Sequence, residues 1–93
     1  MYYGHVSFEF DPRKAAANLR KHGVSFAEVE PVLYDPRALT REDPDATGEP
    51  RYLTVGMGAL GRVLMVCWTE RGSSARVISA RLATARERKC YES

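Results

Sequence analysis

Three strand-like segments that follow one another at short intervals do most to limit what this chain can fold into. Residues 51–57, 62–70 and 75–82 are rich in β-branched and apolar side chains, which favour extended backbone. The intervals between them are built from turn-forming residues, namely Gly58, Gly61, Gly72, Ser73 and Ser74. Because a parallel crossover needs a dozen or more residues, connections this short predict antiparallel neighbours.

A short strand and a helix are predicted before these segments. Residues 5–10 alternate between apolar and polar side chains, which is the period of a strand. Asp11 and Pro12 then provide an N-cap and a proline in the first helical turn. Gly23 supplies a stop signal, so the helix is expected to end there.

Two further helices are predicted from capping-box patterns. Ser25 pairs with Glu28 to open the second helix. Pro31 lies within its apolar stripe and removes a backbone hydrogen bond, so this helix should be short or kinked. Residues 37–49 lack apolar periodicity and are predicted to form an acidic loop. The pattern recurs at Thr84 and Glu87, which open a C-terminal helix over residues 84–91.

The predicted order is therefore β-α-α-β-β-β-α in a single domain over residues 1–93. It gives an α+β fold: a small antiparallel sheet, two N-terminal helices on one face and a C-terminal helix. In residues 51–57 the apolar odd positions, Leu53, Val55 and Met57, are expected to face the core. In the last strand Ile78, Ala80 and Leu82 should do so, which leaves Arg81 on a mixed, more polar face.

Basic side chains gather in the second half of the chain. The 93 residues include 14 Lys or Arg and 12 Asp or Glu, a net charge of +2. Residues 51–93 hold eight basic and three acidic side chains, a net charge of +5, whereas residues 35–50 hold two basic and five acidic, a net charge of −3. Concentrated positive charge suits a polyanion, and it equally suits an ordinary solvated surface.

Several classes of protein are excluded by pattern. The longest apolar run, residues 63–68, is far too short for a membrane span, and no signal-peptide pattern is present, so a cytoplasmic location is expected. Cys67 and Cys90 are expected to be free thiols, since cytosolic disulfides are rare. The sequence has no Walker A, G-x-S-x-G or H-E-x-x-H motif and no metal-ligand spacing, so no metal or cofactor is expected.

A series of short phrases, taken in order, resembles the BrnT toxin family, part of the broader RelE-like ribonuclease toxins. They are FEFDP at residues 8–12, NLRKHGVSF at 18–26, WTERG at 68–72 and RVISAR at 76–81, continuing through Arg86, Glu87, Arg88, Tyr91 and Glu92. The resemblance covers essentially the whole chain from residue 8. It implies a RelE-like fold and metal-independent RNA cleavage that blocks translation. It also implies a BrnA-like ribbon-helix-helix antitoxin, in a hetero-oligomer that binds operator DNA through the antitoxin and represses its own operon.

Such cleavage requires a base for the ribose 2′-hydroxyl, cations for the phosphate and an acid for the 5′-oxygen. Arg81 is the first candidate for the phosphate, and Arg51 is the second, although its odd position would place it on the core side. His22, Glu87 and Tyr91 are the candidates for proton transfer, and Tyr91 could instead stack on a base. Four more basic residues are expected to bind RNA: Arg76, Arg86, Arg88 and Lys89.

Each candidate also has a purely structural interpretation. Arg81 could close the edge of the sheet, His22 could cap the first helix, and Glu87 could serve only the capping box. Two other functions would use the same basic half of the chain: a non-catalytic nucleic-acid-binding module, or a protein-binding subunit. RNA cleavage by the purified protein in the presence of a chelator distinguishes a ribonuclease from both.

Overall fold

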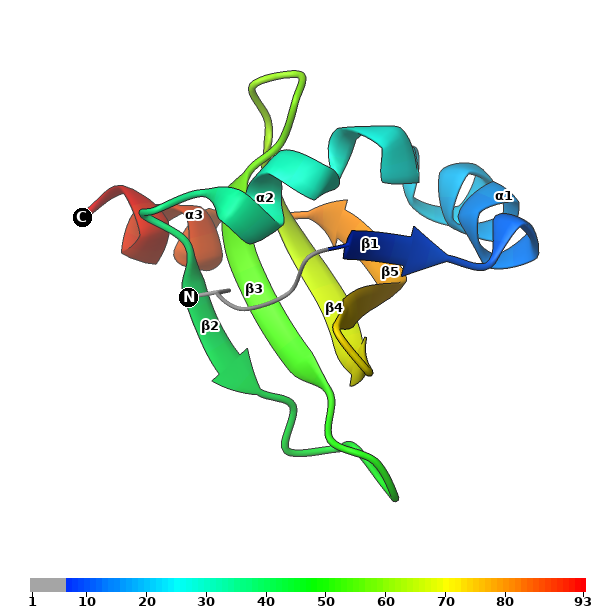
Figure 1. The fold of residues 1–93 in the computed structure, drawn as a ribbon. Coiled ribbons are helices and arrows are strands. Elements are labelled where there is room, and N and C mark those ends of the chain that lie inside the picture. The colour runs from blue at the N-terminus through cyan, green and yellow to red at the C-terminus, as the bar shows by residue number, and fades with distance from the viewer. Residues whose placement is uncertain (1–6) are drawn as a thin grey trace.

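A computed structural model describes residues 7–93 as a five-stranded sheet with helices on both of its faces (Figure 1). The strands are β1 Ser7–Phe10, β2 Leu39–Glu42, β3 Tyr52–Met57, β4 Val63–Arg71 and β5 Ser74–Leu82. The helices are α1 Pro12–His22, the single-turn 3₁₀ helix η1 Phe26–Glu28, α2 Glu30–Tyr34 and α3 Ala85–Glu92. The predicted α+β class is confirmed. No helix within residues 7–93 is long and apolar enough to cross a membrane.

The sheet order is β1-β5-β4-β3-β2, with β4 at its centre. The hairpins β3–β4 and β4–β5 are antiparallel, as their short glycine-containing turns predicted. The sheet is not antiparallel throughout, because β1 pairs in parallel with β5 at one edge. His5 and Val6, the start of the first predicted strand, lie outside the described residues.

Helix α1 has the expected ends. The Asp11 side chain accepts a hydrogen bond of 2.8 Å from the Arg13 backbone N–H, and Pro12 occupies the first turn. At the other end, Gly23 adopts a left-handed conformation with φ of 69°, and its N–H donates to the Leu19 carbonyl at 2.9 Å. That conformation favours glycine, so the chain can turn sharply toward η1.

The second predicted helix is divided into η1 and α2, with Pro31 in the first turn of α2. Ser25 caps η1 by accepting from the Ala27 N–H at 3.1 Å. The predicted capping box with Glu28 is wrong. The buried Glu28 carboxylate instead accepts from Arg62 in the β3–β4 connection, at 3.1 Å from Nε and 2.6 Å from Nη2. This ion pair fixes the hairpin turn against η1.

The predicted acidic loop over residues 37–49 is wrong in part, because it contains β2. This four-residue strand lies at the edge of the sheet, antiparallel to β3. The Thr40 hydroxyl shares a hydrogen bond of 2.9 Å with the Thr54 hydroxyl of β3. So short a strand has no periodicity of its own to detect, because its pairing with β3 is what stabilises it.

The main core lies between the sheet and the layer formed by α1, η1 and α2. Its buried residues are Val24, Phe26, Val29, Val32, Leu33, Leu64, Val66, Trp68, Ala75, Val77 and Ala80. In Figure 1, α2 crosses in front of β3 and α3 lies behind it. A second, smaller cluster on the α3 side contains Val55, Met65, Ala83 and Tyr91. Each face of the sheet therefore has its own apolar contacts.

The predicted faces of β3 are inverted. Thr54 is fully buried in the main core, where its hydroxyl accepts from the Trp68 indole N–H at 2.8 Å. Gly56 faces the same layer, and a Cβ there would lie only 3.1 Å from Val32 of α2. The apolar odd positions consequently face the other side. The faces of β3 were assigned from side-chain polarity alone. That criterion failed because a hydrogen-bonded threonine and a glycine can both be buried beneath a helix.

The expected core set of β5 is wrong in part: Ala80 is buried in the main core as predicted, but the strand contains a β-bulge. Cys67 pairs with Ser79 and Trp68 with Val77, so Ile78 is the extra residue. Val77 and Ala80 are both buried in the main core as a result, whereas Leu82 is 48% exposed. Beyond the bulge the alternation resumes, and Arg81 lies on the opposite face, as expected.

Candidate functional site

The sheet face turned away from α1 and α2, here called the open face, carries a group of arginines. Arg81 of β5 is the register partner of Met65, and Met65 is the partner of Val55. Arg41 of β2 is the register partner of Leu53 in β3. Arg76 follows Ala75, which is buried in the main core, so the Arg76 side chain points to the open face. Burial raises the pKa of the Cys67 thiol, and Arg51 lies close enough for its charge to oppose that increase.

Arg51 therefore does not lie on the core side, which corrects the expectation for its position. The inversion of the β3 faces places it on the open face, with Arg81. Burial has the larger effect on Cys67 and leaves the pKa of its thiol raised. Cys67 and Cys90 are both free thiols, as predicted.

Arg81 forms a bidentate ion pair with Glu87 of α3. The two Arg81 Nη atoms lie 2.8 Å and 3.0 Å from the two Glu87 carboxylate oxygens, and Nη1 also donates to the Leu82 carbonyl at 3.1 Å. The hydrogen bonds from Arg81 lower the pKa of Glu87 to about 2, although burial opposes them. At neutral pH Glu87 is thus an ionised carboxylate with no proton to donate.

Glu87 and Tyr91 both attach α3 to the rest of the molecule. Glu87 completes the predicted capping box with Thr84, which is confirmed by hydrogen bonds of 2.8 Å and 3.2 Å. Tyr91 is only 8% exposed, and its hydroxyl donates to Asp35 at 2.5 Å. Burial and this hydrogen bond raise the pKa of the Tyr91 hydroxyl. The geometry gives Tyr91 the role of an anchor for α3.

Asp35 is a residue that sequence reasoning missed. Besides Tyr91, its carboxylate accepts from the backbone N–H groups of Met57 and Arg37, each at 2.9 Å. Burial raises the pKa of Asp35, but these hydrogen bonds outweigh it and the pKa is lowered. Asp35 therefore joins the end of α2, the end of β3 and α3 through one carboxylate. A place before proline favours the end of a helix and gives no hint of this role.

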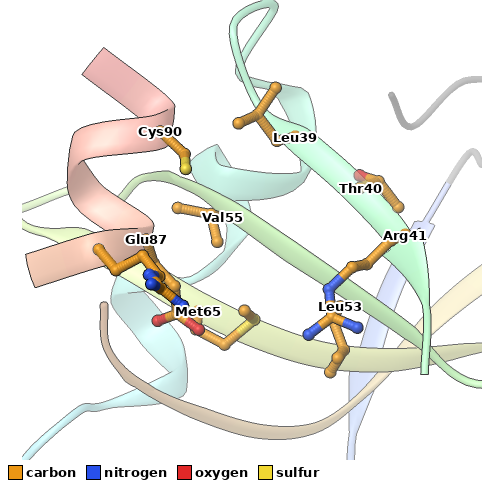
Figure 2. Close-up of a pocket in the computed structure, with 9 residues that line it drawn as sticks. Leu39, Thr40, Arg41, Leu53, Val55, Met65, Glu87 and Cys90 are labelled. Carbon is orange, nitrogen blue, oxygen red and sulfur yellow. The ribbon is translucent and has the colours of Figure 1, made fainter. Parts of the chain in front are cut away.

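A groove of about 290 Å³ runs between α3 and the strands β2, β3 and β4. Its lining residues are Leu39, Thr40, Arg41, Leu53, Val55, Met65, Arg86, Glu87 and Cys90. Figure 2 shows Cys90 of α3 and Leu39 of β2 on opposite sides of the hollow, with Val55 between them. The groove thus has an apolar floor, and it adjoins the Arg81–Glu87 pair.

His22 lies in a different hollow, at the end of α1. That hollow is also lined by Lys14, Lys21, Ile78 and Ser79, among others, and it shares no lining residue with the groove. Ser79 is two positions before Arg81 in β5, a separation of about 6.6 Å along a strand. Arg81 lies on the open face, whereas His22 belongs to α1, which packs against the opposite face of the sheet.

The expected RNA-binding residues fall into two groups. Arg76 lies on the open face and forms an ion pair of 3.2 Å with Glu9 of β1. Arg86 lines the groove, and Arg88 and Lys89 are exposed elsewhere on α3. The open face therefore carries several cations, which is what binding of a polyanionic strand requires.

The ion pair between Arg81 and Glu87 predicts a pH-dependent stability. Because folding lowers the pKa of Glu87 from 4.5 to about 2, its ionised form stabilises the fold above pH 4.5, and this contribution is lost as the pH falls toward 2. The free energy of unfolding of Glu87→Gln should therefore lie below wild type by about 1 kcal/mol near neutrality, since both partners are partly exposed. Urea unfolding of both proteins at a series of pH values should show this gap closing in acid. A gap that stays constant with pH would contradict the assignment.

Comparisons with known proteins agree with this architecture. A family model described as the ribonuclease toxin BrnT of type II toxin–antitoxin systems matches residues 10–87. Among solved structures, the crystal structure of the Brucella abortus ribonuclease toxin BrnT matches with a TM-score of 0.62 and 26% sequence identity, over 84% of this chain and 96% of that chain. No curated protein matches. The family match includes all of β2 to β5 and the start of α3, so this chain belongs to the family of BrnT ribonuclease toxins of type II toxin–antitoxin systems.

Proposed function

We propose that this chain is a metal-independent endoribonuclease that blocks translation in the cytoplasm until an antitoxin neutralises it. The observation that carries the proposal is the position of Arg81 on the open face, beside an apolar groove and among other arginines. The bonds of Arg81 to Glu87 and Leu82 use three of the five guanidinium N–H groups, which leaves the N–H of Nε and the second N–H of Nη2 for two phosphate oxygens. Such preorganised cations stabilise the charge that develops during phosphoryl chemistry. The prevalence of cationic side chains on this face also opposes the binding of a divalent metal ion.

In the proposed reaction, the scissile phosphate lies at Arg81, with Arg51 as a second cation on the same face. The ribose 2′-oxygen attacks phosphorus while the bond from phosphorus to the 5′-oxygen breaks, which gives a 2′,3′-cyclic phosphate and a 5′-hydroxyl. One group must remove the 2′ proton and another must protonate the 5′-oxygen. We assign one of these proton transfers to His22, whose hollow is lined in part by Ile78 and Ser79 of the strand that carries Arg81, and the other to water. Glu87 and Tyr91 then act as positioning residues, because their hydrogen bonds hold α3.

The proposed partner is a BrnA-like ribbon-helix-helix antitoxin that covers residues 76–93. A type II system requires a protein antitoxin, and the net charge of +5 on residues 51–93 favours an acidic partner surface. RNA and the antitoxin then compete for the same end of the open face. The toxin–antitoxin complex, through the DNA-binding antitoxin, represses its own operon.

The central test is RNA cleavage by the purified protein in the presence of a chelator, together with growth of cells that express the chain without its partner. We expect cleavage and growth arrest, and we expect co-expression of the cognate antitoxin to restore growth. A protein in which Arg81 is replaced by alanine, purified identically, controls for contaminating nucleases. Folded protein that binds RNA without cutting it would favour a non-catalytic binding module instead. Indifference to RNA would favour a protein-binding subunit.

A further inference from the structure

The groove under α3 adjoins the proposed phosphate site, and its lining combines an apolar floor with charged side chains from β2 and α3. Val55 and Met65 on its floor are buried at 7% and 6% exposure, whereas Leu39 on its wall is 48% exposed. Leu39 is therefore the exposed apolar side chain at the rim of a groove whose floor is largely covered by its neighbours. The volume of about 290 Å³ is enough for a flat heterocycle and too small for a folded element of a partner.

We propose that this groove binds one unpaired nucleobase of the RNA, next to the phosphate held by Arg81. The inference rests on the proposed function and names the part of the substrate that the site recognises. Proteins that read single-stranded RNA splay a base out of the strand and pack its face against apolar or planar side chains. Here the floor supplies Val55 and the polarisable thioether of Met65.

The charges around the groove fit a nucleotide better than an isolated apolar group. Arg41 enters its lining from β2 and Arg86 from α3, so cations approach from two elements on different sides. A guanidinium plane can stack on a base, and it can also pair with the phosphates that flank it. The carboxylate among the lining residues, Glu87, is outnumbered by Arg41 and Arg86, so the lining carries a net positive charge. An anionic strand is therefore not repelled by it.

Strand register connects the groove to the proposed site of cleavage. Met65 on the groove floor is the direct partner of Arg81, and neighbouring strands lie about 4.8 Å apart. A base and its own phosphate are covalently linked, so a base in the groove would hold that phosphate at Arg81. Such positioning of the reacting group is a main source of rate enhancement. The groove would then set which base adjoins the cut.

The test uses short RNA oligonucleotides with 2′-O-methyl groups, which cannot be cleaved, and replaces one base at a time by an abasic sugar. We expect one position at which removal of the base weakens binding to the wild-type chain about ten-fold. Cys90→Phe fills the groove from an exposed position on α3. It should bind the intact oligonucleotide about ten-fold more weakly and should no longer distinguish the abasic one. Leu39→Ala, which widens the groove, should reduce the same penalty.

The matched control is Leu60→Ala in the β3–β4 turn, an apolar residue that is 72% exposed and outside the groove. It should keep the wild-type penalty, and circular dichroism should show that all variants are folded. An equal penalty in wild type and Cys90→Phe would overturn the proposal, as would the absence of a penalty at every position. If the wild-type chain fails to cut unmodified RNA but Cys90→Phe abolishes the penalty, the base site stands and the ribonuclease proposal fails. Protection of Cys90 from alkylation by the antitoxin alone, with no base penalty, would assign the groove to that protein.

Discussion

Replacement of Arg81 by alanine is expected to lower the rate of RNA cleavage about 100- to 1000-fold and to abolish growth arrest. The reason is the loss of a preorganised guanidinium at the phosphate, and removal of one such donor typically has an effect of this size. Arg81→Lys keeps the charge but loses the two-pronged geometry, so it should retain only part of the activity. Single-turnover cleavage of a labelled RNA measures both. Full activity of the alanine variant would remove Arg81 from the site.

The Arg81–Glu87 pair allows this role to be separated from a structural one. Glu87→Ala breaks the same ion pair and leaves the guanidinium on the open face. If Arg81 acts on phosphate, Glu87→Ala should retain far more activity than Arg81→Ala. Equal losses, with faster hydrogen exchange across α3 in both variants, would show instead that Arg81 serves mainly to hold the helix. Activity and helix exchange together therefore decide between the two roles.

Local signals accounted for the element order except for β2. The caps of α1 and α3 are side-chain patterns confined to one turn, and the hairpin turns are marked by glycine, so both could be read without knowing the fold. The edge strand β2 could not, because only its pairing with β3 makes it a strand. The parallel pairing of β1 with β5 joins segments more than sixty residues apart in the chain, and no local pattern encodes it.

The candidate site was less accessible to sequence reasoning, for a related reason. The side to which a strand residue points depends on what covers each face, and the buried Thr54 and the β-bulge at Ile78 reversed two such assignments. Arg51 consequently lies on the open face, and not on the core side as expected. The roles of Tyr91 and Asp35 depend on a contact between α3 and the end of α2, which no pattern in either segment predicts.

Asn18 is expected to be the polar side chain on which the end of β5 depends most. It is 6% exposed in the middle of α1, where composition suggested only a helix. Its amide nitrogen donates to the carbonyls of Val24 at 3.0 Å and Ala80 at 2.8 Å, and its oxygen accepts from the Ala80 N–H at 3.0 Å. Because β1 pairs with β5 only as far as Val77, the amide completes the edge of β5 beyond that point. It does so immediately before Arg81.

Asn18→Ala should lower the free energy of unfolding by about 3 kcal/mol, since it leaves one buried N–H and two buried carbonyls without partners. That is a large share of the 5–15 kcal/mol typical of a domain. Asn18→Asp should be at least as destabilising, because a carboxylate cannot donate to the two carbonyls and would face their oxygens. Arg20→Ala, at an exposed position on the same helix, should change stability by less than about 0.5 kcal/mol. Urea unfolding measures all three. A loss below about 1 kcal/mol in both Asn18 variants would show that water replaces the amide, and that the position of Arg81 is fixed by its ion pair with Glu87 alone.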